Sequence, residues 1–376
     1  MVDRDRMLGR LLALIRAGSP SRREGEMAAL VREELASLGL RAESDRAHEH
    51  FGGETGNLIC RVPGADDLPP IMLNAHLDTV EPGQGIEPRV ADGVLRAGGD
   101  TVLGADDKAG VTAILEALHV LRERGLRHPP LEIVFTVAEE AGLLGARHLD
   151  YSALAARVAF SLDSSGPVGG IVVRAPGEEK ITATIHGRAA HAGVAPEEGV
   201  NAIAIASRAI AEMRLGRIDD ETTANVGTIH GGAAINIVPD RVVAEGEARS
   251  HDPGKLRAQV DHMVERFRAQ AQAAGGRAEI AVEPLYQRFA LGDDDLPVAI
   301  ARLAAQELGL PVALKSSGGG SDANIFNAHG IATVVLAVGC EQMHTTEETL
   351  PLDELERLGE WTLRLITRAA EVMAPQ

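Results

Sequence analysis

Two polar residues close an otherwise apolar stretch of the chain, "IMLNAHLDTVEPG" at residues 71–83. His76 and Asp78 stand two positions apart, so in a continuing strand both side chains would point to the same side. A buried imidazole and a buried carboxylate cost free energy unless other groups satisfy them. A partner for both must therefore come from elsewhere in the chain.

Further carboxylates and a second histidine occur at similar places. Asp106 lies just before a predicted helix, Glu139 and Glu140 follow "IVFTVA", Asp163 follows "VAFSL", and His344 comes shortly after "ATVVLAVG". Loops at the carboxyl ends of parallel strands gather at one edge of a sheet. Together with the histidine at 76, these residues form an oxygen- and nitrogen-rich set of the kind that binds zinc, cobalt or manganese. The recurrence predicts a metal site.

Each of these positions also has an ordinary structural interpretation. An Asp before a helix, such as Asp106, is most often an N-cap, and the pair Glu139 and Glu140 could be a solvated loop or the start of a helix. Asp163 could cap a turn, and His344 could be a hydrogen-bonded core or surface residue. Only the recurrence of such residues at equivalent places in the architecture favours the metal site.

The elements that would position these residues alternate between strands and helices. Apolar runs predict strands at 57–62, 70–76 and 131–137, and "GADDKAGVTAILEALHVLRERG" predicts a helix at 104–125. The unbroken run at 131–137 is typical of a strand covered on both faces. This order predicts an α/β fold with a mixed, mostly parallel sheet flanked by helices.

The segment that precedes these strands predicts two helices. In "MVDRDRMLGRLLALIRAGSP" the apolar run is too short for a signal peptide and is typical of one face of an amphipathic helix. A Ser21/Glu24 capping box and a stop at Gly39 predict the second helix. No run approaches eighteen apolar residues, so we expect a soluble, cytoplasmic protein.

The rhythm of the pattern changes between about residues 177 and 284, where the predicted order is β-α-β-β-α-β. This order is that of the ferredoxin-like split unit, and 376 residues are enough for two domains. We therefore predict a discontinuous domain at residues 1–176 and 285–376 that carries the metal site. An α+β domain at 177–284 is inserted into it.

Charge and cysteine content exclude several classes of protein. The formal net charge is −18, from 55 acidic and 37 basic residues, which argues against nucleic acid and anionic membranes as partners. The two cysteines, Cys60 and Cys340, allow neither a disulfide framework nor a Cys-rich zinc site.

Six motifs together resemble one family. They occur in order over nearly the whole chain: "NAHLDTVEPG", "LGADDKAGV", "FTVAEEAGLLGA", "SLDSSGPVG", "HAGVAPEEGVNA" and "SSGGGSDANIF". The combination resembles the dinuclear zinc exopeptidases, which include peptidase T, carboxypeptidase G and the aminoacylases. The "GADDKAG" and "HAG" forms are most similar to the peptidase T-like subgroup.

The resemblance implies a site for two divalent metal ions, with zinc expected and cobalt or manganese as alternatives. Asp106 would bridge the two ions. His76 and Asp163 would complete one metal site, and Glu140 and His344 the other.

The resemblance also implies roles for residues beside the metals. Asp78 would hold the other ring nitrogen of His76. Glu139 would be the general base, which takes a proton from the water bridging the two ions and returns it to the leaving amine. The peptide bond before Asp107 is expected to be cis, and Asp107 and Lys108 are otherwise expected to be structural residues at the start of a helix.

For the inserted domain, the resemblance implies a lid that also forms a homodimer. His191 would reach across the dimer interface to stabilise the tetrahedral oxyanion, and Asn236 and Arg249 would bind the far end of the substrate. The planar guanidinium of arginine is well suited to a carboxylate. Alternatively, His191 is a loop histidine of the lid and Arg249 pairs with a neighbouring acidic residue.

The glycine-rich segment "SSGGGSD" at 316–322 lacks the lysine and the spacing of a phosphate-binding P-loop. In the family this turn lies beside the substrate, so Gly319, Gly320 and Ser321 are candidate substrate-binding residues. A simple tight turn into a helix is the alternative.

Together these inferences predict a metal-dependent exopeptidase that removes the N-terminal residue of short peptides, as a tripeptide aminopeptidase does. Asp163 favours this activity, because carboxypeptidases and deacylating relatives more often carry Glu there. One alternative is an amidohydrolase of N-acyl amino acids, or a carboxypeptidase, with the same dinuclear site. Another is a non-catalytic metal-binding or interaction protein, which predicts a missing ligand or base, although each of them is present.

Overall fold

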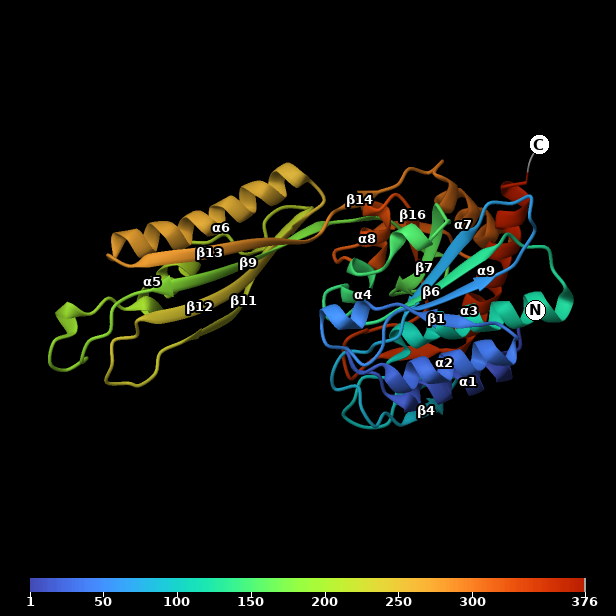
Figure 1. The fold of residues 1–376 in the computed structure, drawn as a ribbon, viewed down its shortest axis with the longest axis horizontal. Coiled ribbons are helices and arrows are strands. Elements are labelled where there is room, and N and C mark those ends of the chain that lie inside the picture. The colour runs from blue at the N-terminus through green and yellow to red at the C-terminus, as the bar shows by residue number, and fades with distance from the viewer. Residues whose placement is uncertain (375–376) are drawn as a thin grey trace. The chain divides into compact units, whose positions relative to one another are not determined.

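The computed structural model describes residues 1–374, and the chain divides into two compact units. The first unit contains Met1–Val173, Ala290–Ser316 and the chain from Ser321 onward. The second unit contains Arg174–Phe289 and the short segment Ser317–Gly320. Figure 1 shows the elements of each unit along the chain.

The first unit is built on a nine-stranded mixed sheet, which confirms the predicted fold class. The strand order is β1 (Ala42–Ser44), β2 (Leu58–Val62), β6 (Leu131–Thr136), β3 (Ile71–His76), β7 (Val158–Ser164), β16 (Ala332–Ala337), β8 (Gly170–Ala175) and β14 (Phe289–Ala290), with β15 (Ala313–Ser316) paired to β8. The four central strands β6, β3, β7 and β16 are parallel. The pairs of β1 with β2, β2 with β6, and β8 with β16 are antiparallel.

Helices pack on this sheet. They are α1 (Arg4–Ala17), α2 (Gly25–Ser37), α3 (Ala105–Arg124), α4 (Leu144–Arg147), α7 (Leu296–Glu307), α8 (Asp322–Ala328) and α9 (Leu352–Val372). Helix α3 contacts β3 and β7, while α1 and α9 pack on α3. The core is mainly Leu, Ile, Val and Ala, as a chain with 2% aromatic residues requires. A small sheet of β4 (Pro88–Ala91), β5 (Val94–Ala97) and β17 (Thr349–Pro351) completes the unit.

The predicted capping box at the start of α2 is wrong. Helix α2 begins at Gly25, and Glu24 at the N-cap position makes no side-chain capping hydrogen bond. Instead, Glu24 Oε1 accepts the Ala138 N–H at 3.0 Å, and the Ser21 hydroxyl donates to Asp78 at 2.6 Å. Both side chains turn away from the helix because buried polar groups after β3 and β6 compete for them.

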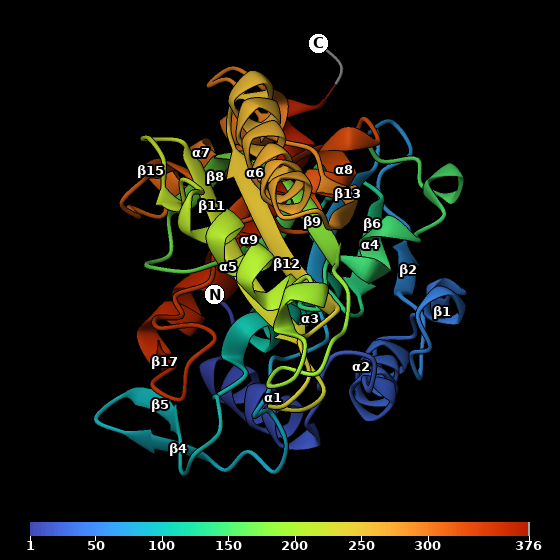
Figure 2. The same cartoon turned by 90° about the vertical axis from the view of Figure 1, so that its left-hand side faces the viewer.

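The second unit is a five-stranded antiparallel sheet with the order β10 (Gly216–Arg217), β11 (Thr222–Gly231), β12 (Arg241–Ser250), β9 (Gly177–His186) and β13 (Arg277–Tyr286). Its helices α5 (Ala202–Ala211) and α6 (Pro253–Ala273) pack side by side on one face of this sheet (Figures 1 and 2). Apart from β10, the order along the chain is β-α-β-β-α-β. Within residues 1–374, no helix combines the length and the apolar character that crossing a membrane requires.

Candidate metal centre

The five predicted metal ligands meet at the carboxyl edge of the parallel strands. His76 is the last residue of β3, Glu140 follows β6, Asp163 lies near the end of β7, and His344 follows β16. Asp106 stands at the start of α3. Because the four strands run in the same direction, their ends deliver these side chains to one edge of the sheet.

Asp106 occupies the middle of this cluster. One of its oxygens, Oδ1, lies 3.3 Å from His76 Nε2, and the other, Oδ2, lies 3.1 Å from His344 Nε2. His76 Nε2 is also 3.6 Å from Asp163 Oδ1, and His344 Nε2 is 2.8 Å from Glu140 Oε1. The contacts therefore divide into two groups that share Asp106.

The electrostatics of the cluster fit a divalent cation. Burial raises the pKa of Asp163 to about 6 and raises that of Glu139 well above its ordinary value, with neighbouring carboxylates adding to both shifts. Hydrogen bonds with Asp106 and Glu140 raise the pKa of His344 to about 10. The site thus gathers several buried carboxyl groups whose ionised forms a bound cation would favour. Imidazole nitrogens and carboxylate oxygens are ligands of zinc, cobalt and manganese, so the donor set suits such an ion.

The Asp78 carboxylate organises the main chain of both glutamates. Its Oδ1 accepts the Glu139 N–H at 2.9 Å, and its Oδ2 accepts the Glu140 N–H at 3.1 Å. His76 Nδ1 lies 3.0 Å from the main-chain oxygen of Asp78 and 3.5 Å from its Oδ1. The ring is thus oriented mainly by the Asp78 carbonyl, while the carboxylate serves the turn after β6.

Asp107 and Lys108 are buried at the start of α3. The peptide bond between Asp106 and Asp107 is cis. The Asp107 carboxylate accepts the His76 N–H at 3.2 Å and the Gly110 N–H at 3.2 Å, so it ties β3 to the helix. Burial lowers the pKa of Lys108 to about 8, and its ammonium group donates to the Thr79 hydroxyl.

Two supports of the cluster escaped the sequence-based prediction. The Glu348 carboxylate accepts the Gly104 N–H at 2.7 Å and the Asp106 N–H at 3.0 Å. The Asp322 carboxylate, 1% exposed, accepts the Thr136 hydroxyl at 2.5 Å. Thr136 belongs to the apolar run of β6, and a polar residue inside such a run is a signal that could have identified this contact. Glu348 lies in a polar loop with no such signal.

A chain of buried polar side chains continues from Thr136 below the metal residues. Asn74 Nδ2 donates to the Thr136 hydroxyl at 3.2 Å, and the Ser161 hydroxyl donates to Asn74 Oδ1 at 2.6 Å. Asn74 and Ser161 each stand two positions before a predicted ligand, on the same face of the strand as that ligand. This series of hydrogen-bonded side chains therefore links β6, β3 and β7 next to the predicted ligands.

The predicted residues of the lid belong to the second unit. His191 is exposed, and its Nδ1 accepts the Gly193 N–H at 3.2 Å. The Ala192 N–H donates to the Asn236 main-chain oxygen at 2.9 Å. The loops that carry His191 and Asn236 therefore lie side by side.

Arg249 pairs with acidic neighbours in the second unit. Its guanidinium donates to both oxygens of Glu247, at 3.2 and 2.8 Å, and lies 3.4 Å from Glu178. Pairing with a neighbouring acidic residue is the structural alternative to a substrate-binding role for Arg249. It also fixes the orientation of the guanidinium, as a carboxylate-binding group would require.

The predicted substrate loop divides between the units. Gly319 and Gly320 belong to the second unit, and a Cβ atom on Gly320 would lie 2.3 Å from the Tyr286 ring. Ser321 belongs to the first unit and caps α8 in a capping box with Asn324. Ser321 thus begins a helix, and Gly320 lies close to an aromatic ring. The substrate-binding role of this loop stays a prediction.

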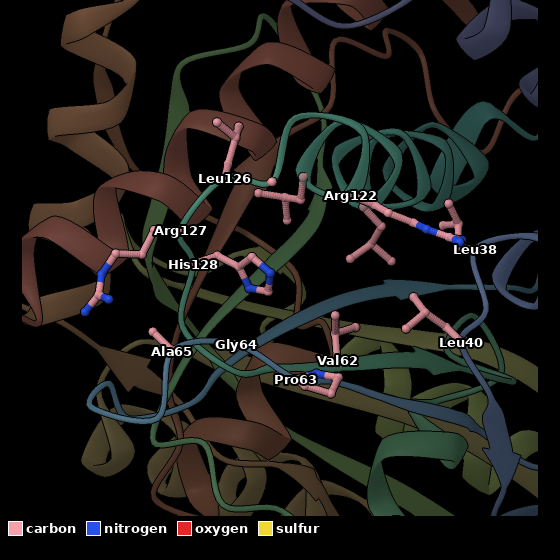
Figure 3. A pocket seen from close by; sticks show the side chains of 13 residues that line it. Leu38, Leu40, Val62, Pro63, Gly64, Ala65, Arg122, Leu126, Arg127 and His128 are labelled. Carbon is pink, nitrogen blue, oxygen red and sulfur yellow. The ribbon is translucent and has the colours of Figure 1, made fainter.

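A cavity of the first unit lies at the far end of α3 from Asp106 (Figure 3). Its volume is about 560 Å³, and its lining includes Leu118, Leu121 and Leu126 but no acidic residue. None of the predicted site residues lines it, so the metal cluster and this cavity are separate features.

Comparison with known proteins gives consistent matches over nearly the whole chain. The model of peptidase family M20/M25/M40 matches residues 72–368. Uncharacterized protein YqjE of Bacillus subtilis is 45% identical over 371 residues, which cover 99% of this chain and 100% of that protein.

Two crystal structures show the same fold. Aminopeptidase PepT from Bacillus cereus is 44% identical, with a TM-score of 0.88 over 98% of this chain and 99% of that one. A tripeptidase from Staphylococcus aureus is 42% identical, with a TM-score of 0.93 over 99% of this chain and 100% of that one.

Proposed function

The chain belongs to peptidase family M20/M25/M40, and we propose that it is a metal-dependent aminopeptidase that removes the N-terminal residue of tripeptides and other short peptides. The observation that carries this proposal is the cluster around Asp106, in which two histidines and two further carboxylates gather beside Glu139. Similarity to an aminopeptidase and to a tripeptidase over nearly their full lengths supports the class of substrate.

In this proposal Asp106 would be shared by two divalent cations, one held also by His76 and Asp163 and the other by Glu140 and His344. When bound, such ions polarise the scissile carbonyl and lower the pKa of the attacking water. The ligand set accepts zinc, cobalt or manganese, and zinc is the ion we expect. The two groups of contacts that share Asp106 support a dinuclear rather than a mononuclear site.

Glu139 is the proposed general base. Burial and the nearby Asp163 carboxylate raise the pKa of Glu139 well above its ordinary value. The positive charge of bound cations would favour the ionised form, which can accept a proton from the attacking water. The same side chain then returns the proton to the leaving amine. Its main-chain N–H donates to Asp78, which fixes the backbone that carries the carboxylate.

We also propose a homodimer formed through the second unit. Apolar side chains are exposed on the neighbouring loops of His191 and Asn236, with Val194 76% and Ile235 104% exposed. Neighbouring exposed apolar residues mark protein interfaces. In the dimer, His191 would stabilise the oxyanion in the site of the partner, and Asn236 and Arg249 would bind the far end of the peptide.

A cytoplasmic location is part of the same proposal. Cys60 and Cys340 are buried and form no disulfide, which is typical of a reducing compartment.

A paired assay tests the activity. The metal-loaded protein is given a tripeptide with a free amino group and, separately, the same tripeptide with an acetylated amino group. We expect hydrolysis of the free peptide only, with loss of activity after chelation and recovery when the metal is restored. Hydrolysis of the acetylated peptide instead would contradict the proposal and favour the deacylase or carboxypeptidase alternative.

A further inference from the structure

Three successive main-chain N–H groups after β6 donate to two buried carboxylates. The Ala138 N–H donates to Glu24 Oε1 at 3.0 Å, and the N–H groups of Glu139 and Glu140 donate to Asp78 at 2.9 and 3.1 Å. The turn that carries the proposed base and a proposed ligand is therefore held by side chains from outside it.

Glu24 holds this turn at Ala138, a residue with positive φ. The same Oε1 atom accepts the Arg22 N–H at 2.7 Å as well as that of Ala138. Both donors have positive φ, 74° at Arg22 and 51° at Ala138. Residues with a Cβ atom rarely adopt this region, and they persist there only where their surroundings fix them. One buried oxygen thus fixes two turns that are more than a hundred residues apart in sequence.

Helix α2 does not explain why Glu24 is buried. Glu24 is 0% exposed and precedes the helix directly, yet its side chain makes no capping hydrogen bond. Its Oε2 atom is buried without a hydrogen-bond partner among the described residues. A carboxylate that served the helix would accept bonds from the helix N–H groups. Burying this carboxyl group costs free energy of folding. A role in the helix alone would not explain its hydrogen bond with the Ala138 N–H.

We propose that Glu24 is a positioning residue for the hydrolytic reaction and acts through Ala138 on the Glu139 carboxylate. Ser21 contributes to the same support, since its hydroxyl donates to Asp78 at 2.6 Å. The segment before α2 therefore supplies one of the two carboxylates that hold the turn, Glu24, and contacts the other, Asp78. The inference rests on the proposed function, because it assigns Glu139 to the chemical step.

Kinetics of three variants test the proposal. Displacing a reacting group by about 1 Å can cost on the order of a hundredfold in rate, so we expect Glu24→Ala to lower kcat by about 10- to 100-fold. KM and the number of bound metal ions should stay within twofold of the parent values. Glu24→Gln keeps an oxygen acceptor for both N–H groups and should retain most of kcat. Glu26→Gln, an exposed change in the first turn of α2, is the matched control and should match the parent.

A second substitution separates positioning from a general structural role. Glycine adopts positive φ without a penalty, so Ala138→Gly should restore part of kcat in the Glu24→Ala background. Arg22→Gly relieves the other turn and should not. Equal kcat in Glu24→Ala and the parent would overturn the proposal, as would an equal loss of kcat in Glu24→Gln and Glu24→Ala.

Hydrogen exchange gives a readout that does not depend on activity. We expect faster amide exchange in the peptide that contains residues 138–140 in Glu24→Ala than in the parent or in Glu26→Gln. If Glu24→Ala does not fold, Glu24→Asp replaces it, because the shorter side chain keeps the charge but withdraws the acceptor from Ala138. A parent that hydrolyses no peptide would contradict the proposed function alone. Unchanged exchange at 138–140 would contradict the role of Glu24.

Discussion

At the scale of single residues, the site combines two imidazoles with buried carboxyl groups whose pKa values shift in opposite directions. Asp106 lies between two imidazoles, and hydrogen bonds with His344 and His76 lower its pKa against the opposing effect of burial. The carboxyl groups of Asp163 and Glu139 shift in the opposite direction, because burial raises the pKa of each of them. Asp106 is thus held ionised between the histidines, whereas burial disfavours the ionised forms of Asp163 and Glu139, which a bound cation would favour.

Replacing the proposed base separates chemistry from metal binding. General acid–base catalysis contributes about 10²- to 10⁴-fold, so we expect Glu139→Gln to lower kcat by an amount in this range. Metal content should not change, because the five proposed ligands remain. Elemental analysis and initial rates measure the two quantities on the same sample. Glu43→Gln, on the exposed strand β1, is the control, and retention of parental kcat by Glu139→Gln would exclude Glu139 as the base.

Glu178 gives the second unit a dependence on pH. Burial and the adjacent Glu247 raise the pKa of Glu178 from 4.5 to about 7. The folded protein therefore binds more protons than the unfolded chain between these values, and stability falls as the pH rises through this window. We expect the drop in Tm between pH 5 and pH 8 to be smaller in Glu178→Gln than in the parent. An identical drop in both proteins would show that Glu178 does not titrate in this range.

At the scale of elements, periodicity and apolar runs predicted most strands and helices. Strand β3, for example, was predicted at 70–76 and spans Ile71–His76, and α3 was predicted at 104–125 and spans Ala105–Arg124. The mixed sheet followed from their alternation. These patterns are formed by residues that are close in sequence. They therefore predict single helices and strands, together with the polar residues at the ends of those elements.

Contacts between distant segments were not predictable in this way. Ser21 and Glu24 have the spacing of a capping box, yet they bond to Asp78 and Ala138. Glu348 supports Asp106 from a loop that lies more than two hundred residues further along the chain. The spacing of residues within one segment does not predict such partners. They depend on which unpaired polar groups of distant segments come close together when the chain folds.

The loop Ser317–Gly320 lies very close to the Tyr286 side chain of the second unit. A Cβ atom on Gly320 would lie 2.3 Å from the Tyr286 ring, whereas one on Gly318 meets nothing within 4 Å. We expect Gly320→Ala to destabilise the protein by about 1–3 kcal/mol through overpacking, and Gly318→Ala to have little effect. Thermal unfolding of the two variants measures the difference, and equal Tm values would show that the ring moves aside without cost.

At the scale of the whole molecule, the proposed homodimer depends on the exposed apolar loops of the second unit. We expect Ile235→Asp to shift the protein from dimer to monomer in light scattering, because it places a charge among the exposed apolar side chains of the proposed interface. Val90→Asp alters a 45% exposed residue of β4 in the first unit and is the control. A parent that is monomeric at micromolar concentration would contradict the dimer without affecting the metal site.

The order of strands in the first unit determines when the site can form during synthesis. Strand β16 pairs with β7 in the parallel centre of the sheet, but the whole second unit lies between them in the sequence. His344 follows β16, so a nascent chain that still lacks this segment contains four of the five proposed ligands and an open sheet. The proposed hydrolytic centre therefore lacks one of its five ligands until residue 344 has been synthesised and β16 has paired with β7.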